Sequence, residues 1–266
     1  MANALAGQPT KANPYMTTGI ERILPPALVL VLFVTAWQFG SYWFDVPKYL
    51  VPAPSDFMGR FVTDRNDLAY NFAATGWVVV CGFCIATLIA MPLGLAIASF
   101  PSLRRSLLPV IVFFEIIPKT ITAPLLIVWF GFGFTPRIAL TAVMTFFPIL
   151  VNSIAGFSAM NPRLNLITSS MGASSWQTFR YIRLPAAMPF IFSGMKIGMV
   201  YAVSGCITAE LVGANQGLEV LILSAAGYMD VALVFAGIMA TAGLAMLLTG
   251  ILLGFEKWTM PWRNDQ

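Results

Sequence analysis

Long apolar stretches without charge alternate with short polar segments along this chain. Six of the stretches are long enough to cross the hydrocarbon core of a bilayer, which takes about 20 helical residues. Because backbone N–H and C=O groups cannot stay unpaired in lipid, each stretch is expected to be a helix. The six predicted spans are residues 23–44, 72–99, 106–132, 138–159, 186–211 and 231–255.

The polar segments between the spans predict an orientation. Lys and Arg are enriched in cytoplasmic connections. With the N-terminus inside, the inner segments carry nine Lys and Arg, and the outer ones carry four: Lys48, Arg60, Arg65 and Arg137. Both termini are therefore expected in the cytoplasm. The predicted organisation is a disordered N-terminus (1–22), a transmembrane domain (23–256) and a cytoplasmic tail (257–266).

The composition supports a membrane protein. Apolar residues fill 58% of the 266 positions and charged residues 10%, whereas an ordinary soluble domain is about a quarter charged. The net charge is +4 and no basic run exceeds Arg104-Arg105, so the positive charge indicates orientation rather than a nucleic-acid partner. The absence of histidine excludes histidine metal ligands, Ser-His-Asp triads and histidine proton relays. No cofactor, metal or catalytic site is predicted.

Small residues recur inside two spans. The second span carries such residues at every fourth position, and the sixth carries Gly250 and Gly254. Stripes of this kind allow helices to approach closely in lipid, although Gly and Ala are also common in membrane helices generally. The stripe in the second span consists of Gly82, Ala86, Ala90, Gly94 and Ala98. The three cysteines lie in apolar stretches and are interpreted as small apolar side chains.

The inner connection between the fourth and fifth spans, residues 158–185, is longer than a simple hairpin requires. A helix is expected over 162–171, with Gly172 interrupting it. Ser174 followed by Gln177 has the spacing of a capping box, and Pro185 is expected to end the helix that follows. Apolar residues recur at helical spacing on that helix: Trp176, Phe179 and Ile182. The segment could also be an amphipathic helix lying on lipid headgroups.

This loop resembles the EAA loop in permease subunits of binding-protein-dependent ABC importers. The family pattern is EAA, three residues, Gly, nine residues, Ile, one residue and Leu-Pro. Gly172, Ile182, Leu184 and Pro185 match it in every spacing, whereas Leu166, Ile167 and Thr168 occupy the EAA positions. In the family, this loop supplies the coupling helices that bind the ATPase subunit. The resemblance therefore implies an ATPase-coupling role for Gly172, Ser174, Trp176, Phe179, Ile182, Leu184 and Pro185.

Further motifs resemble the nitrate, sulfonate and taurine branch of these importers. They are Val51-Pro52-Ala53-Pro54-Ser55, Ile117-Pro118-Lys119, Ala123-Pro124-Leu125, Trp129-Phe130-Gly131, Phe147-Pro148-Ile149 and Gly194-Met195-Lys196-Ile197. The resemblance implies an all-α type I importer permease in the bacterial inner membrane, passing a small, anionic solute from a binding protein to the cytoplasm. It also implies two ABC ATPase subunits and a second copy of the permease as partners. The chain has no GxxxxGK[ST] motif, so the ATPase site is expected on a partner and not on this chain.

Four charged residues fall inside predicted spans: Glu115, Lys119, Lys196 and Glu210. Each costs about 2.5 kcal/mol or more at mid-membrane when ionised. Glu115 and Lys119 are four residues apart, so they could pair on one helix face as a structural pair, or lie in the translocation path and receive an anion. Lys196 is expected to extend toward the cytoplasm, and Glu210 to lie in water near the outer end of the fifth span.

Two other classes of function remain open from the residues alone. An ion-coupled secondary transporter would work without an ATPase and would show internal repeats and acid-lined, unwound helices at the midplane. An integral membrane enzyme would need catalytic side chains clustered at one membrane face. ATP-dependent transport on addition of an ATPase separates the permease from the secondary transporter.

Overall fold

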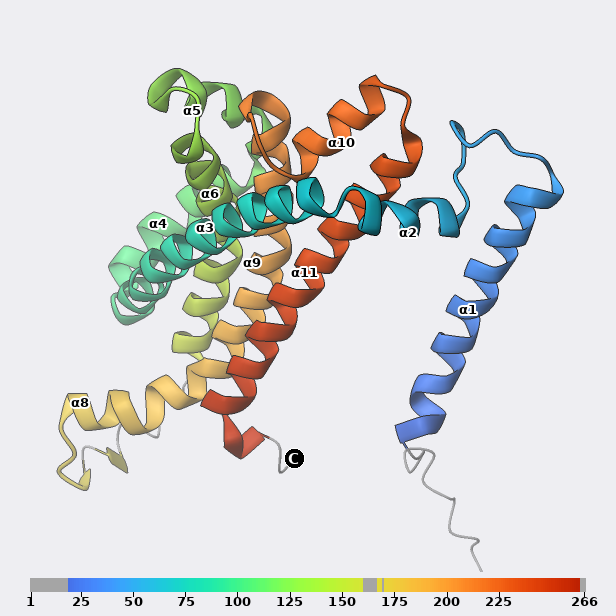
Figure 1. Cartoon of the computed structure of the whole chain (residues 1–266). Coiled ribbons are helices and arrows are strands. Elements are labelled where there is room, and N and C mark those ends of the chain that lie inside the picture. The colour runs from blue at the N-terminus through green and yellow to red at the C-terminus, as the bar shows by residue number, and fades with distance from the viewer. Residues whose placement is uncertain (1–18, 160–166, 169, 264–266) are drawn as a thin grey trace, which may run out of the picture.

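The chain is helical over nearly all of the residues that the structure describes. The structure is a computed structural model, and it describes residues 19–159, 167, 168 and 170–263. Five helices are long and apolar enough to cross a membrane, and α10 is a shorter apolar helix. The elements are α1 (Gly19–Trp43), α2 (Pro54–Thr63), α3 (Arg65–Ser99), α4 (Pro101–Ile116), η1 (Lys119–Ile121), α5 (Thr122–Phe130), α6 (Phe134–Ser158), α8 (Ser175–Thr178), η2 (Phe179–Arg183), α9 (Leu184–Gly213), α10 (Leu218–Gly227), α11 (Val231–Thr259) and η3 (Pro261–Arg263) (Figure 1).

Helices α3, α6 and α9 form the centre of the bundle, and small residues permit their close approach. A Cβ atom added to Gly82 of α3 would lie 2.5 Å from Thr141 Cγ2 of α6. One added to Gly94 would lie 2.6 Å from Ser153 Cβ. The small-residue stripe predicted for the second span is therefore confirmed as a contact face between α3 and α6.

The corresponding expectation for the sixth span is wrong. Gly250 and Gly254 of α11 are exposed, and an added Cβ would meet no atom within 4 Å at either position. Helix α11 instead packs through other residues of its length, among them Ala236 and Leu244, both buried. Gly250 and Gly254 therefore make no helix contact within the described part of this chain.

The predicted third span, residues 106–132, is broken in the middle. Helix α4 ends at Ile116, and Ile117 has extended backbone with φ −63° and ψ 126°. The cause is Pro118, because its ring disfavours helical backbone in the preceding residue and it has no N–H to donate. The chain resumes as η1 and α5. With 16 and 9 residues, α4 and α5 are each too short to cross the membrane alone, so this crossing is discontinuous.

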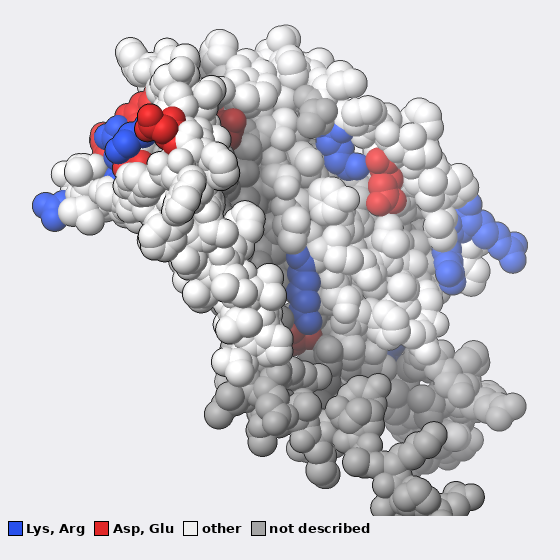
Figure 2. Space-filling view, turned by 90° about the vertical axis from the view of Figure 1, so that its right-hand side faces the viewer, with Lys and Arg blue, Asp and Glu red and all other residues white. Residues whose placement is uncertain are grey.

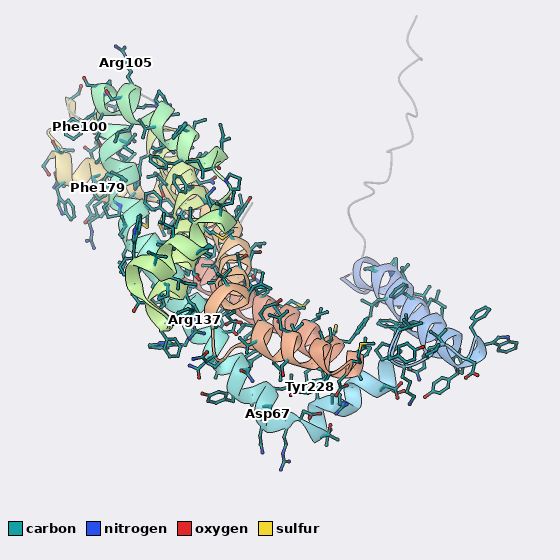
Figure 3. The ribbon with its side chains drawn as sticks, turned by 90° about the horizontal axis from the view of Figure 1, so that it is seen from above. Asp67, Phe100, Arg105, Arg137, Phe179 and Tyr228 are labelled. Carbon is teal, nitrogen blue, oxygen red and sulfur yellow. The ribbon has the colours of Figure 1, made fainter. Side chains whose placement is uncertain are left out.

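Helix α1 stands away from the bundle in both ribbon views (Figures 1 and 3). None of the residues in its apolar part, Leu24–Trp43, is buried. Only its second half is held: the Trp37 ring lies 5.6 Å from the ring of Phe57 on α2 and 5.6 Å from that of Phe235 on α11. Most of the α1 surface therefore makes no contact with the rest of the described chain.

The elements separate into two ends of the molecule. The start of α1, the end of α11 and α8 lie at one end, and α5 and α10 lie at the other (Figure 1). Since α8 belongs to the predicted inner loop, both described chain ends lie on the side of that loop, as an even number of crossings requires. Residues 1–18 of the predicted disordered N-terminus and residues 264–266 of the predicted tail fall outside the described residues, so these domain limits stay predictions.

Candidate coupling surface and membrane-embedded charges

The turn and the cap predicted in the inner loop are both present. Gly172 has φ +74°, a left-handed conformation that glycine adopts without steric cost. Ser174 Oγ accepts a hydrogen bond from the Gln177 N–H at 3.2 Å, and Gln177 Oε1 accepts one from the Ser174 N–H at 2.8 Å. The reciprocal pair is the predicted capping box. It fixes where the second helix of the loop begins.

An aromatic stack joins this helix to the bundle. The Trp176 ring lies 5.6 Å from the Phe179 ring, which lies 6.4 Å from the Phe157 ring of α6, and both pairs are stacked. Trp176 is 64% exposed, whereas Phe179 and Ile182 are half-buried. Of the three apolar residues predicted at this face, Trp176 is the one whose side chain is exposed, and Phe179 stacks against its ring.

The prediction that Pro185 ends the short helix is wrong. Residues Ser175–Gly213 form one continuous helix of 39 residues. The turn η2 is a π-helix, in which the Leu184 N–H donates to the Phe179 carbonyl five residues earlier. Proline has no N–H to donate, and its ring crowds the carbonyl one turn back. The wider π-turn relieves this conflict, so the inner loop and the fifth span form a single helix.

The first half of the inner loop lies largely outside the described residues. These omit 160–166 and 169, so the helix predicted over 162–171 is not tested. At the three positions where the family pattern has EAA, Leu166 is among those omitted, Ile167 is exposed and Thr168 is buried. A contribution of this half to coupling stays a prediction.

The expected side-chain pair of Glu115 and Lys119 does not occur among the ion pairs of the described residues. The helix ends between the two residues, so the spacing of four no longer places them on one face. Lys119 Nζ instead donates to the backbone carbonyl of Glu115 at 2.9 Å and lies 5.1 Å from the centre of the Phe147 ring on α6. The ammonium thus stabilises the C-terminus of α4, where carbonyls lack helical partners.

Lys196 forms an ion pair that was not predicted from the sequence. Its Nζ lies 2.6 Å from Oε2 of Glu256 on α11, and the two side chains are 30% and 9% exposed. The sixth span was predicted to end at residue 255, directly before Glu256, but α11 continues to Thr259. Opposite charges on two distant spans could have suggested the pair, although the sequence gives no register between those spans. On the face seen in Figure 2, charged side chains form a few separate groups.

The expectation that Glu210 lies in water is wrong. Its side chain is only 2% exposed. Its carboxylate accepts hydrogen bonds from the Thr75 hydroxyl at 2.7 Å and from the Glu219 N–H at 3.1 Å. The glycines at 213 and 217 could have indicated that the chain turns back there and covers Glu210. Arg137, predicted on the outer side, is also buried, at 3% exposed.

Comparisons with known proteins agree with this geometry. The family model described as binding-protein-dependent transport system inner membrane component matches residues 82–258, well over half of the chain. The riboflavin transport system permease protein RibX of Chloroflexus aurantiacus is 32% identical over 95% of this chain and 96% of its own length. The formylaminopyrimidine transport permease protein ThiX of Halalkalibacterium halodurans is 28% identical over 91% of this chain and 97% of its own. The taurine transport system permease protein TauC of Escherichia coli is 28% identical over 88% of each chain.

The match spans the core helices α6 and α9, the described part of the inner loop and nearly all of α11. It therefore identifies a component of a binding-protein-dependent transport system and not an ion-coupled secondary transporter. The chain belongs to the family of binding-protein-dependent transport system inner membrane components: it is a multi-pass permease subunit of an ABC importer in the inner membrane, of the branch that includes the taurine permeases.

Proposed function

We propose that two copies of this chain, two ABC ATPase subunits and a solute-binding protein together import a small anionic solute. The names of the three relatives specify riboflavin, formylaminopyrimidine and taurine, all small organic molecules, and we extend this class to this chain; the anionic character of the solute is proposed from Lys119 alone. The ATPase sites belong to the partner subunits, and this chain contributes the passage. The observation that carries the proposal is an exposed Trp176 on a helix that continues into a membrane span.

The coupling contact is proposed at the aromatic stack. Trp176 leaves most of its ring exposed on the side where both described chain ends lie. Buried aromatic anchors dominate the energy of protein interfaces. The ring of Trp176 stacks on Phe179, which in turn stacks on Phe157 of α6, so the exposed ring is fixed relative to the bundle. A helix lying on lipid headgroups would not need a stack that ties it to α6. The stack therefore favours a protein partner over the lipid surface.

The test is Trp176→Ala, with Trp258→Ala as the matched control. Trp258 is a second exposed tryptophan, at the inner end of α11 and 77% exposed. Losing an interface anchor costs about 2 kcal/mol or more, which is roughly a 30-fold loss of affinity for the ATPase. Co-purification and ATP hydrolysis by the assembled complex should therefore fall for Trp176→Ala alone. Phe179 is less suitable for this test, because it is half-buried and its substitution would also disturb folding. Equal ATPase binding by both variants would reject the coupling surface.

A second copy of the chain is proposed beside α1. This span buries none of its residues, and most of its surface has no partner in the described chain. A lone span surrounded by lipid is stable, but the discontinuous third crossing also exposes large side chains, including Ile116, Val128 and Trp129. The exposed surface of α1 and that of the third crossing could both contact a second permease chain, and two chains in contact would enclose a path between them.

The path itself is proposed to pass Lys119. The break between α4 and η1 leaves backbone polar groups that lipid cannot satisfy, so irregular backbone at this depth is expected to be buried in protein or to line a cavity. Lys119 is half-exposed there and its ammonium lies against Phe147. A cation next to an aromatic ring suits a small organic anion. Mass spectrometry of the ligand released from the co-purified binding protein would identify the solute.

A further inference from the structure

The beginning of α10 is held by side chains of three core helices. Three successive backbone N–H groups at this point each donate to a different side chain, and the backbone carbonyl just before them accepts a hydrogen bond from a fourth side chain. The bonds are Gly217 N–H to Asn71 Oδ1 (2.8 Å), Leu218 N–H to Thr75 Oγ1 (2.9 Å), Glu219 N–H to Glu210 Oε2 (3.1 Å), and Arg137 to the Gln216 carbonyl (2.8 Å). Asn71 and Thr75 belong to α3, Arg137 to α6 and Glu210 to α9.

The side chains of Asn71, Thr75, Arg137 and Glu210 that hold the start of α10 form an outer polar cluster, and Glu210 is its central member. Its Oε1 accepts the Thr75 hydroxyl at 2.7 Å, so Thr75 donates to α9 while it accepts from α10. The carboxylate also lies at the N-terminus of α10, where a negative charge is favourable. A buried carboxylate without such partners would be strongly destabilising. Its bonds to α3 and α10 thus depend on both helices staying in place.

Arg137 holds the residues that precede α10. It is 3% exposed, and besides the Gln216 carbonyl it donates to the Gly133 carbonyl at 3.0 Å. The loop leading into α10 is therefore held from α6 as well as from α3 and α9.

The fit around Gly217 leaves no room for adjustment. Gly217 has φ +136°, and a Cβ atom at this position would collide with the Glu210 carboxylate. The backbone must therefore pass directly over the charged group. A small displacement of α10 would break several buried hydrogen bonds at once and leave charged groups without partners, which is costly in a low dielectric.

We infer that Glu210 is a positioning residue that locks α10 onto α3, α6 and α9, so that these four helices move as one rigid unit through the transport cycle. An importer must open and close its outer side, and this requires some surfaces to separate. Separation between α10 and the core would break the outer polar cluster. The outer opening therefore forms at other surfaces, and α10 travels with the core.

The lock is tested by hydrogen exchange on the assembled complex in phospholipid nanodiscs. The amides of residues 217–219 should exchange slowly, because each is bound to a buried side chain. Glu210→Gln leaves one acceptor oxygen for two donors, the Thr75 hydroxyl and the Glu219 N–H, so one of these hydrogen bonds is lost and exchange in the peptide covering 214–219 should rise by about tenfold or more. Glu219→Gln is the matched control, because its side chain lies outside the cluster. Unchanged exchange in Glu210→Gln would overturn the role of Glu210.

Should Glu210→Gln fail to assemble, Thr75 provides the second test. Thr75→Val keeps the shape and removes the hydroxyl, so exchange at Leu218 should rise, whereas Thr75→Ser retains the hydroxyl and should restore slow exchange. A general loss of packing would affect both variants and peptides throughout α11. Equal exchange in Thr75→Val and Thr75→Ser would reject the lock.

The rigid unit is tested by tethering α10 to α3. Tyr70 and Gln216 are in hydrogen-bond contact, so cysteines at both positions can be joined by a short bismaleimide, with Cys81 and Cys84 replaced by Ala. The tethered complex should retain ATP hydrolysis stimulated by the co-purified binding protein, as the two single-cysteine variants do. Loss of stimulation in the tethered protein alone would show that α10 must move away from α3, and would overturn the inference.

Discussion

The pair formed by Lys196 and Glu256 makes a quantitative prediction about the inner half of the bundle. It joins α9 to α11, and α9 is continuous with the proposed coupling helix. Lys196→Met keeps the length of the side chain and removes its charge. Glu256, 7% exposed as a residue, then loses the cation 2.6 Å from its carboxylate. We expect a loss of stability that a surface lysine would not cause.

The size of the effect follows from the burial of the two groups. Removing one member of a fully buried pair costs about 3–5 kcal/mol, whereas an exposed pair contributes about 1 kcal/mol or less. The Lys196 side chain is 30% exposed and that of Glu256 is 9% exposed, so the cost should lie between these limits, at about 1–3 kcal/mol. For a chain of this size, each kcal/mol lowers the melting temperature by about 2–4 °C. The expected decrease in melting temperature is about 2–12 °C.

Fluorescence-detected size-exclusion chromatography after heating measures this change in detergent. Lys257→Met is the matched control, since Lys257 directly follows Glu256 on α11 and its side chain is exposed. Lys196→Arg should retain most of the stability, because it keeps the charge. If Lys196→Met melts within 1 °C of Lys257→Met, the pair does not stabilise the bundle and the reasoning from burial fails.

Three further predictions concern the core, the path and the assembly. Gly82→Ala should destabilise the bundle by about 1–3 kcal/mol, because its Cβ would lie within 3 Å of Thr141, whereas Gly250→Ala should be neutral in the same thermal assay; equal effects would refute the contact face. Lys119→Met should reduce uptake of the identified solute and leave assembly and ATP hydrolysis intact, and adding Glu115→Gln should not restore uptake, because Lys119 bonds the backbone carbonyl and not the carboxylate; normal uptake by Lys119→Met would remove it from the path. Native mass spectrometry should find two permease chains for two ATPase subunits, and a single permease chain in the active complex would exclude the pair.

Local chemistry explains which features were predictable from the sequence. Apolar length predicted the spans because the bilayer sets a minimum length for each crossing. The capping box at Ser174 and the turn at Gly172 were predictable because they depend only on neighbouring residues. The break at Pro118 has an equally local cause, but a long apolar run that contains Pro109, Pro118 and Pro124 does not reveal at which proline the helix bends or ends. The π-turn before Pro185 is also caused by a proline, and the sequence does not reveal it for the same reason.

The pairing of charges was not predictable, because it depends on the register between distant spans. Lys196 meets Glu256 across 60 positions of sequence, and Glu210 meets Thr75 across 135. A hydropathy pattern places each charge near the end or the middle of its own span and says nothing about its neighbours. Glu210 was expected in water because its position in the span suggested the membrane surface, whereas the chain folds back and covers it with α10.

One helix connects the proposed ATPase contact with the outer polar cluster. The continuous helix Ser175–Gly213 has 39 residues, or about 58 Å at 1.5 Å per residue, with Trp176 near its inner end and Glu210 near its outer end. Displacement of Trp176 by an ATPase subunit reaches the outer side only if the π-turn and the Lys196 pair hold the helix against the bundle. Weakening either should therefore leave the ATPase bound but reduce transport per ATP hydrolysed. Because the outer polar cluster ties α10 to the same helix, whatever movement reaches Glu210 is carried to α10 as well.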